Sequence, residues 1–566
     1  MSDAEFSSTL ATRVLFVRPC GCEPLAQVYE YIRGQGGDPD IRPLFTRDCA
    51  QLDRERRDAE QRANFPLPDL TRWLRVDAAD ASAAEELADK LSSGKMKFEI
   101  HQATESKAET RHVPSTWVRA GRTWLTRVQW KWALARSRLS RTLAGTWVAD
   151  LSADQGYLLS APWGLGVTDV AGWPFMFRRA ARESRAMRVA VIDDCFHLSH
   201  PDLADIPPAE IQQDGVSLDH LSHGTAVLGL LFPRRDREGL IGIAAGASPV
   251  LVYPYTRQGA LLYYDIADAV SRATQYLGRG DVLLIERHVI SPAQDYLPME
   301  TIPPCRDAMR VAVAKGIIVI EPAGNGSDRL LKLPAEPFGP PRCAWHSGAI
   351  MVGATLRSTP ARGWHGVHDP GTSYGPRIDA SAWGTNVLTA AIAARLQMSS
   401  LDSASQYGTL TKTSAASAQV AGVVAIASCV ARNLAPDGVG PEPWTLRAML
   451  VATGTPSHLA NASKPCGVQP DLLRLLRAVR VALYKTHCVR LPDLSRVSEI
   501  GALGHWLLKY LANGLGVAEM AQAAARDIDT IQCEVDRLHD LFALKQSAPD
   551  SWLRLARVAD WLEDGR

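Results

Sequence analysis

The 566-residue sequence lacks the features of a secreted or membrane-spanning chain. No run approaches the roughly 20 apolar residues that a membrane-spanning helix needs, and the first residues lack the basic stretch that opens a secretory signal. The ten cysteines are scattered and too few for a disulfide framework, which favours reduced thiols. We therefore expect a cytoplasmic protein without a membrane partner.

The sequence also has little net charge and no long repeat or low-complexity tract. Lysine and arginine number 62 against 61 aspartate and glutamate, so the whole chain gives no electrostatic reason to bind nucleic acid. With 46% apolar residues, the composition is globular and excludes a disordered, collagen-like or coiled-coil chain. One stretch differs: residues 110–149 hold eight lysine or arginine residues, five tryptophans and no acidic residue. This stretch could bind nucleic acid or form a helix packed on the neighbouring domain.

Changes of pattern along the chain predict five segments. The first is an α/β segment, the second a strand–helix–strand module, and the third a basic, tryptophan-rich connection. A large central domain and an all-helical module follow. In order, the segments are 1–67, 68–104, 105–160, 161–480 and 496–566.

The central domain alternates short apolar strands with helical segments, one of them expected at Leu261–Tyr276. The pattern predicts an α/β fold with a doubly wound, mostly parallel sheet covered by helices on both faces. In such folds, sites gather beyond the carboxyl ends of the strands, where Asp193 and Asn325 stand. The expected strands are Arg188–Ile192, Pro249–Tyr255, Asp281–Ile285, Gly316–Ile320 and Ala349–Thr355.

Four segments of this domain carry polar residues of the types used in nucleophilic catalysis. In chain order they are Val189–Leu203, Ser222–Gly229, Gly316–Gly326 and Lys412–Gly422, which contain Asp193, His223, Asn325 and Ser414 respectively. They resemble the Asp, His, oxyanion-hole and Ser motifs of the subtilisin-like serine proteases. A single motif would be weak, but four in that family's order make the resemblance specific.

The resemblance implies a serine endopeptidase that acts on a polypeptide through an acyl-enzyme. A serine hydroxyl is a poor nucleophile until an imidazole accepts its proton, so His223 would be the general base for Ser414 and Asp193 would orient it. The Ser414 backbone N–H and the Asn325 amide would form the oxyanion hole. Asp194 is either a solvated neighbour or a modifier of Asp193. No cofactor is required; the family often carries structural calcium, but no acidic loop here nominates ligands and we assign no metal site.

Some residues depart from the family's pattern. Glu286, Arg287 and His288 stand where the family's substrate-pairing strand reads Ser-Leu-Gly, and with Gly324 they are the predicted substrate-binding residues. Glu286 could favour basic substrate side chains, and His288 could narrow the cleft. Lys412 replaces the glycine before Thr-Ser. These departures leave an alternative, a catalytically inactive scaffold.

The segment at 68–104 is similar in pattern to the folding-assistant propeptides of subtilases. We expect it to pack on the protease domain as an intramolecular chaperone or inhibitor. A small α+β module with another purpose is the alternative, because no residue there is diagnostic.

The carboxyl-terminal module resembles the helix-turn-helix of LuxR-type response regulators. By this resemblance Thr530 would N-cap the recognition helix, and Gln532 and Arg537 would face a DNA groove. Residues 501–566 hold seven basic and ten acidic residues, however, which is a poor footprint for duplex binding. Recognition of a protein partner, or oligomerisation, through 496–566 is the alternative.

Overall fold

The computed structural model describes residues 13–102, 106–107, 150–182, 186–194, 196–198, 200–206, 218–234, 238–258, 261–290, 296–326, 346–362, 365–391, 407–458, 461 and 463–564. The basic stretch at 110–149, with its two alternative roles, lies outside the described residues.

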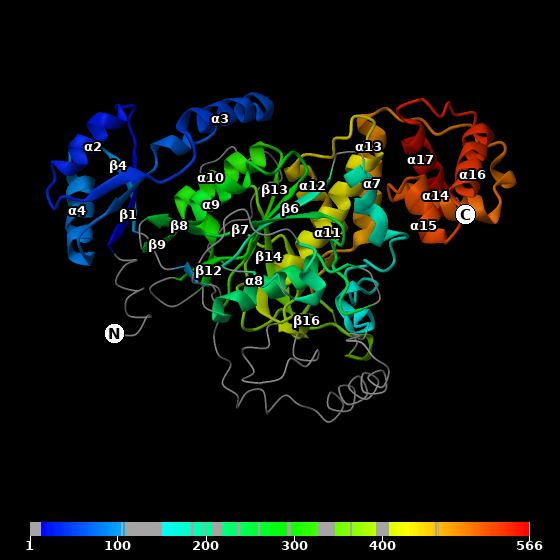
Figure 1. Ribbon diagram of the computed structural model, residues 1–566, viewed down its shortest axis with the longest axis horizontal. Coiled ribbons are helices and arrows are strands. Elements are labelled where there is room, and N and C mark those ends of the chain that lie inside the picture. Colours follow the sequence, from blue (N-terminus) through cyan, green and yellow to red (C-terminus); the bar gives the residue numbers. More distant parts are fainter. Residues whose placement is uncertain are drawn as a thin grey trace.

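An eight-stranded sheet forms the centre of the structure, between an amino-terminal module and a carboxyl-terminal group of helices (Figure 1). Its order is β18-β19-β15-β14-β13-β10-β6-β7, and every pair is parallel except β18 with β19. The predicted mostly parallel sheet is therefore confirmed. The strands are β6 (Arg188–Ile192), β7 (Ser248–Val252), β10 (Val282–Ile285), β13 (Ile318–Pro322), β14 (Ile350–Thr355), β15 (Ala380–Trp383), β18 (Thr455–Pro456) and β19 (Val468–Gln469).

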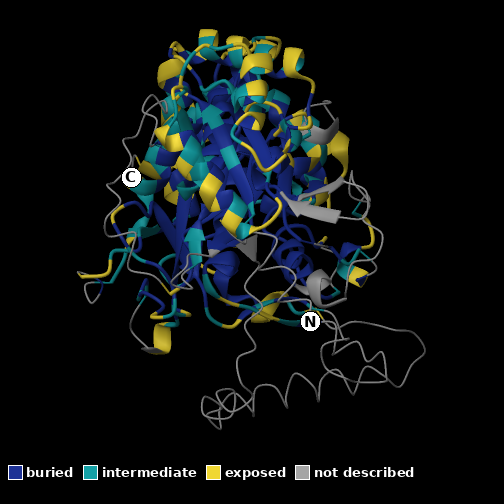
Figure 2. Ribbon diagram, turned by 90° about the vertical axis from the view of Figure 1, so that its left-hand side faces the viewer, coloured by how far each residue is buried: buried dark blue, intermediate teal, exposed yellow. Residues whose placement is uncertain are grey.

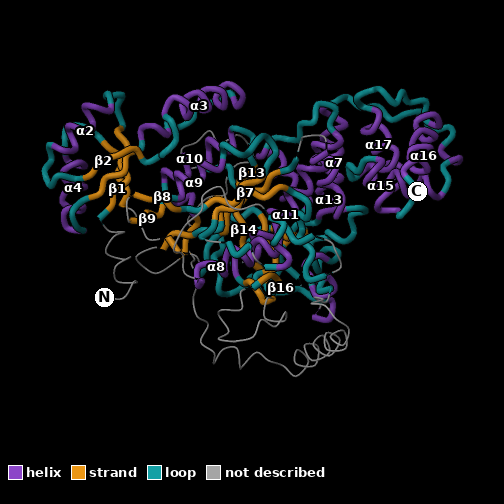
Figure 3. Tube along the Cα trace, in the orientation of Figure 1, coloured by secondary structure: helices purple, strands orange, loops and turns teal. Residues whose placement is uncertain are grey.

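Helices cover both faces of this sheet, because its strands bury side chains on both sides. Val189 and Val191 of β6 join the core formed with α8 (Leu218–Leu231), α11 (Lys412–Leu434), α12 (Pro443–Thr453) and α13 (Leu472–Thr486). Ala190 and Ile192, which alternate with them, join the core formed with α9 (Ile266–Ala273) and α10 (Pro303–Ala314). In Figure 2 the buried residues concentrate between these layers, and Figure 3 shows the strands gathered between the helices.

The helix predicted at Leu261–Tyr276 is wrong in its first part. Residues 261–264 form strand β9 (Leu261–Tyr264), which pairs with β8 (Tyr255–Gln258) in an antiparallel hairpin. The helix α9 begins only after Asp265, whose side chain accepts a hydrogen bond from the Asp268 backbone N–H and caps it.

The longest described helix, α11, runs through the protein beneath the sheet. By length and composition it is apolar enough to cross a membrane, but every residue of its most apolar window is buried inside the protein. Small residues let it approach its neighbours: a Cβ added at Gly422 would lie 2.5 Å from the side chain of Ile243. Contact with the core therefore accounts for its apolar composition.

The amino-terminal module is one antiparallel sheet in the order β2-β3-β1-β4, with α2 (Leu25–Arg33) and α4 (Ala81–Ser93) packed on it. Because β1 pairs with both β3 and β4, the predicted boundary between residues 67 and 68 is wrong. Each half alone would leave its strand edges unpaired. The strands are β1 (Val14–Pro19), β2 (Asp40–Pro43), β3 (Leu74–Asp77) and β4 (Phe98–Gln102).

This module is attached to α9 and α10 of the central domain. The Asp307 carboxylate of α10 accepts a hydrogen bond from Trp73 Nε1 at 3.0 Å and forms an ion pair with Arg18. The helix α3 (Cys49–Ala63) of the module lies along α10, where Glu55 pairs with Lys315 at 2.6 Å. The contact thus combines buried and partly buried polar links with an apolar surface.

The carboxyl-terminal helices share the main hydrophobic core and do not form a separate core of their own. Leu507 and Leu511 of α14 and Ile531 of α16 belong to the same cluster as α11 and α13. A buried ion pair adds to this attachment: Arg480 of α13 donates to both oxygens of Asp560 of α17 at 3.0 Å. These helices are α14 (Ala502–Ala512), α15 (Val517–Ala524), α16 (Ile528–Leu541) and α17 (Ser551–Asp564).

We predict that Asp560→Ala lowers the free energy of unfolding by about 3–5 kcal/mol, because it leaves the Arg480 guanidinium buried without its partner. The matched control is Asp564→Ala, which breaks the half-exposed pair with Arg477 on the same two helices and costs less than about 1 kcal/mol. Chemical denaturation of the full chain measures both. Equal effects of the two changes would contradict a buried attachment.

Candidate active site

The first two predicted residues meet at the carboxyl end of β6. Asp193 directly follows this strand and is completely buried. Its Oδ2 accepts a hydrogen bond of 2.7 Å from Nδ1 of His223, which lies on α8. The backbone N–H of Asp194 donates to the other oxygen, Oδ1, at 2.7 Å. Both carboxylate oxygens are therefore held, and the imidazole is fixed with Nε2 as its remaining nitrogen.

Ser414 is the third residue of α11, so its backbone N–H belongs to the first turn and has no partner within the helix. The turn into the helix requires a left-handed residue at Lys412, which has φ 67°. A glycine would adopt this conformation without strain. The Lys412 backbone N–H donates to the Gly384 carbonyl at 2.6 Å, which holds the turn.

Asn325 follows β13 in a turn between two glycines with positive φ, Gly324 and Gly326. Its Oδ1 accepts a hydrogen bond of 2.9 Å from the hydroxyl of Thr413, the residue before Ser414. Because the amide oxygen is turned toward Thr413, Nδ2 is on the other side of the planar amide. The structure thus brings Asn325 beside the amino terminus of α11.

The hydrogen bonds of the described residues link His223 to Asp193 and not to Ser414. Ser414 instead interacts with the buried carboxyl of Glu286, which also interacts electrostatically with His223. Asp193, His223, Glu286 and Ser414 therefore form one connected group. The sequence pattern gave no signal that Glu286 belongs to it.

The protonation of His223 is set by its surroundings. Burial opposes the charged imidazole, but the charge and hydrogen bond of Asp193 outweigh burial and raise the pKa of His223 to about 9. At neutral pH the free imidazole is therefore mostly protonated, and it becomes a base as the pH rises.

The side chains of residues 286–288 are buried, and the predicted part of these residues in substrate binding stays a prediction. Glu286 accepts a hydrogen bond of 2.7 Å from Ser417, and Arg287 forms an ion pair with Asp194. The His288 ring packs edge-on against Tyr296, and burial lowers its pKa to about 3, which keeps it neutral. All three side chains are about 1% exposed.

Gly324, whose predicted contact with substrate also stays a prediction, lies against another strand of the same chain. A Cβ added there would lie 1.9 Å from the Tyr296 carbonyl oxygen, in strand β12 (Tyr296–Pro298). The backbones of Asn325 and Tyr296 exchange two hydrogen bonds, of 3.1 and 3.3 Å. The glycine therefore lets the chain's own strand approach the turn, where substrate contact was expected.

The backbone of β11 (His288–Ile290) is paired on both edges. On one side it pairs with β12, and on the other with the short strand β5 (Ser106–Lys107), in which Lys107 lies opposite His288. The strand β5 comes shortly after β4 of the amino-terminal module. Residues next to this module thus lie along the strand predicted to bind substrate.

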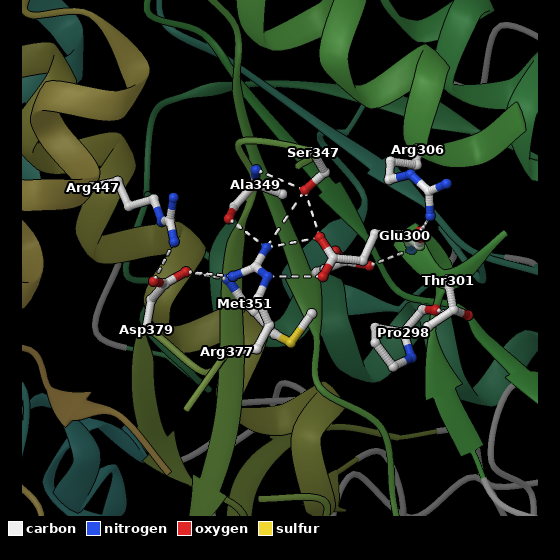
Figure 4. A network of polar contacts seen from close by, with 11 residues as sticks. Pro298, Glu300, Thr301, Arg306, Ser347, Ala349, Met351, Arg377, Asp379 and Arg447 are labelled. Atoms are coloured by element: carbon white, nitrogen blue, oxygen red, sulfur yellow. Dashed lines mark hydrogen bonds and ion pairs between the residues drawn. The ribbon is translucent and has the colours of Figure 1, made fainter. Parts of the chain in front are cut away.

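A buried ion network lies at the end of β12, around Arg377, Glu300 and Asp379. No motif in the sequence indicated this network. Arg377 donates to both oxygens of Glu300 at 2.8 Å and to Asp379 at 3.0 Å (Figure 4). Asp379 in turn accepts a hydrogen bond of 2.8 Å from Arg447 of α12. The network joins the segment after β12 to the start of β15 and to α12.

The described residues contain no group of three or more His, Cys, Asp or Glu side chains arranged to hold a metal ion. Structural calcium therefore remains unassigned, and no described residue is nominated for it. The expectation that the reaction needs no cofactor stays a prediction.

The predicted DNA-contacting residues lie on α16, in the carboxyl-terminal helices at the far end from the amino-terminal module (Figure 1). Thr530 does not cap this helix; Asp527 does, by accepting hydrogen bonds from the backbone N–H groups of residues 529 and 530. The Gln532 side chain donates to Asp536 at 2.6 Å, and Arg537 donates to Glu534 at 2.6 Å. Both predicted contact residues are thus paired with acidic neighbours.

Comparison with known proteins agrees with this architecture. A family model described as the Subtilase family matches residues 184–468, which is just over half of the chain. The chain is 27% identical over 180 residues to the protein named Intracellular serine protease of Paenibacillus polymyxa, which covers 30% of this chain and 50% of the relative. It is 24% identical over 273 residues to M-protease of Shouchella clausii (strain KSM-K16), which covers 47% of this chain and 59% of the relative.

Among solved structures, fervidolysin from Fervidobacterium pennivorans, described as a keratinolytic enzyme related to subtilisin, matches 82% of this chain and 60% of its own. The identity is 14% and the TM-score 0.46. The chain spans only 50% and 59% of the length of the two curated relatives it matches. From the extent of the family match, the chain belongs to the subtilase family, the subtilisin-like serine proteases.

Proposed function

We propose that this chain is a serine endopeptidase that hydrolyses peptide bonds of a polypeptide through Asp193, His223 and Ser414. The observation that carries the proposal is the 2.7 Å hydrogen bond between His223 and a fully buried Asp193. A buried carboxylate bound to Nδ1 leaves Nε2 as the base and stabilises the imidazolium that forms when it accepts a proton.

The proposed reaction has two stages. In the first, Ser414 Oγ attacks the carbonyl carbon of the peptide bond while its proton passes to His223 Nε2, and the amine then leaves with that proton. In the second, water attacks the resulting ester on Ser414 while His223 accepts a proton from the water, and His223 then returns this proton to Ser414 Oγ as the acid product leaves.

The negative charge on the carbonyl oxygen would be stabilised by two donors. One is the Ser414 backbone N–H at the amino terminus of α11, where the helix dipole is positive. The other is the Asn325 amide, whose oxygen accepts a hydrogen bond from Thr413 beside the amino terminus of α11. Loss of one such donor costs roughly 10²–10³ in kcat, a value known for a subtilisin.

We predict that the intact protein is labelled by a fluorophosphonate serine probe and that Ser414→Ala abolishes this labelling, because the change removes the nucleophile. Asn325→Ala should keep Ser414 but slow peptide hydrolysis by roughly 10²–10³. The matched control is Ser428→Ala, on the far end of the same helix, where the hydroxyl binds the Gly280 carbonyl. Its labelling should equal that of the unaltered protein.

We propose further that the amino-terminal module regulates the peptidase by holding β5 against β11. The support is the antiparallel register of β5 on β11 and the links from Arg18 and Trp73 to Asp307. While β5 lies there, an extended substrate has no access to that edge of β11. That the module also assists folding of the protease domain, as an intramolecular chaperone, stays a prediction.

The double change Arg18→Ala and Trp73→Ala should loosen this module and raise the initial rate of peptide hydrolysis by about tenfold, because it removes two links to the buried Asp307. The rate is measured before any self-cleavage, with Glu86→Gln as a control on an exposed part of the module. An unchanged rate would show that the module does not inhibit. If both the intact and the loosened protein fail to label with the probe, the inactive scaffold becomes the better explanation.

DNA binding by a LuxR-type module, through Thr530, Gln532 and Arg537, stays a prediction. The acidic first turn of α16, with Asp527 and Asp529, disfavours approach of phosphates, so a role in the shared core or in binding a protein partner is better supported. We expect the full chain to give no salt-dependent gel shift with duplex DNA. A shift that weakens with salt and is lost in Arg537→Ala would restore the DNA hypothesis.

The cytoplasmic location also stays a prediction. All eight cysteines in the described part of the chain are free, which supports a reducing surrounding.

A further inference from the structure

Five ionisable side chains lie buried together beneath the proposed site. Asp193 and Asp194 follow β6, Glu286 and Arg287 follow β10, and His223 comes from α8. None of them is more than 8% exposed. Burying charged side chains lowers the stability of the fold unless they are paired. We therefore ask how these five side chains interact and what role they have in the site.

Glu286 joins the strand ends to the first turn of α11. Its backbone N–H donates to the Ile192 carbonyl at 3.0 Å, next to Asp193. Its Oε1 accepts a hydrogen bond of 2.7 Å from Ser417, whose hydroxyl also contacts the carbonyls of Thr413 and Ser414. Through Ser417, the Glu286 carboxyl is therefore bound to the turn that carries the nucleophile.

The charges around Glu286 couple it to His223. Burial is the main influence and raises the pKa of Glu286 to about 8; His223 opposes this shift, and Asp193 adds to it. In return, Glu286 favours the protonated form of His223 while Arg287 disfavours it. The other group facing them, His288, is neutral.

Counting these groups explains the coupling. Asp193 and Asp194 contribute two negative charges and Arg287 one positive charge, which leaves a net negative charge in a buried space. With one proton, on either His223 or Glu286, the five groups carry a net charge of −1, and a second proton makes them neutral. The two groups therefore titrate as a pair.

We propose that Glu286 is a positioning residue of this site: its carboxyl fixes the first turn of α11 through Ser417, and its charge favours the protonated form of His223. The inference rests on the proposed function of Ser414 and His223. It predicts that the acidic limb of kcat/KM, which rises as His223 loses its proton, lies at a higher pH in this chain than it would without the Glu286 carboxyl.

The test compares pH profiles of kcat/KM for the unaltered full chain and for Glu286→Gln, which keeps an acceptor for Ser417 but removes the charge. Removing a neighbouring negative charge lowers the pKa of His223, so the midpoint of the acidic limb should fall from about 9 by about one pH unit. Because Glu286, with a pKa of about 8, is itself mostly protonated at pH 7, the two proteins should differ little at that pH, and the rate relative to the plateau should rise most between about pH 8 and 9. Glu86→Gln, on an exposed helix, should leave the midpoint unchanged.

Ser417→Ala separates the two roles, because it removes the hydrogen bond but keeps the carboxyl. In Ser417→Ala, kcat on the plateau of the pH profile should fall about tenfold, while the midpoint of the acidic limb of kcat/KM should stay above that of Glu286→Gln. An unaltered plateau would overturn the positioning role. If Glu286→Gln fails to fold, Glu286→Ser replaces it, with the same expected shift.

A measurement that needs no turnover keeps this inference distinct from the proposed function. In a Ser414→Ala background, NMR titration of the His223 ring gives its pKa directly, with and without Glu286→Gln. If the probe labels Ser414 but the His223 midpoint is the same in both proteins, the role of Glu286 is wrong and the peptidase stands. If the midpoint falls but nothing labels or hydrolyses, the peptidase is wrong and the electrostatic coupling stands.

Discussion

The hydrogen bond between His223 and Asp193 joins two parts of the fold, the end of β6 and the helix α8. It requires Asp193 to be at the carboxyl end of β6, and β6 is fixed there by parallel pairing with β7 and β10. It also requires α8 to lie against the sheet so that His223 faces that end. The layers of helices over a parallel sheet therefore serve, in this chain, to hold one imidazole against one carboxylate.

The same region shows how far the sequence predicts the structure. The strands β6, β10 and β13 are runs of valine, isoleucine and leucine, and they were predicted to within a few residues because both faces of the sheet are buried. The short strand β15, Ala-Ser-Ala-Trp, has no β-branched residue, and it forms because β14 offers an edge to pair with. Residues 261–264 are likewise a strand only because residues 255–258 pair with them.

The places of the site residues on the backbone could be predicted from the motifs, whereas the directions of some side chains could not. Asp193, His223 and Asn325 follow or lie on regular elements, so their places followed from the order of the motifs. The inward direction of Glu286 depends on Ser417, which is 131 residues away in the sequence. At the carboxyl-terminal end, Asp527 and Thr530 are both acceptable caps by residue type, and only the actual start of α16 decides between them.

The pairing of β5 with β11 determines how β5 would compete with an extended peptide for the edge of β11. Since β5 belongs to the same chain, its local concentration at β11 is set by the length of the connecting segments and does not change with dilution of the protein. If the proposed inhibition holds, an extended peptide would have to replace β5 on β11, at a concentration high enough to match the local concentration of the tethered strand. A single cut in the chain between residue 107 and the central domain would turn this intramolecular competition into ordinary reversible binding, held only by the contacts of the amino-terminal module.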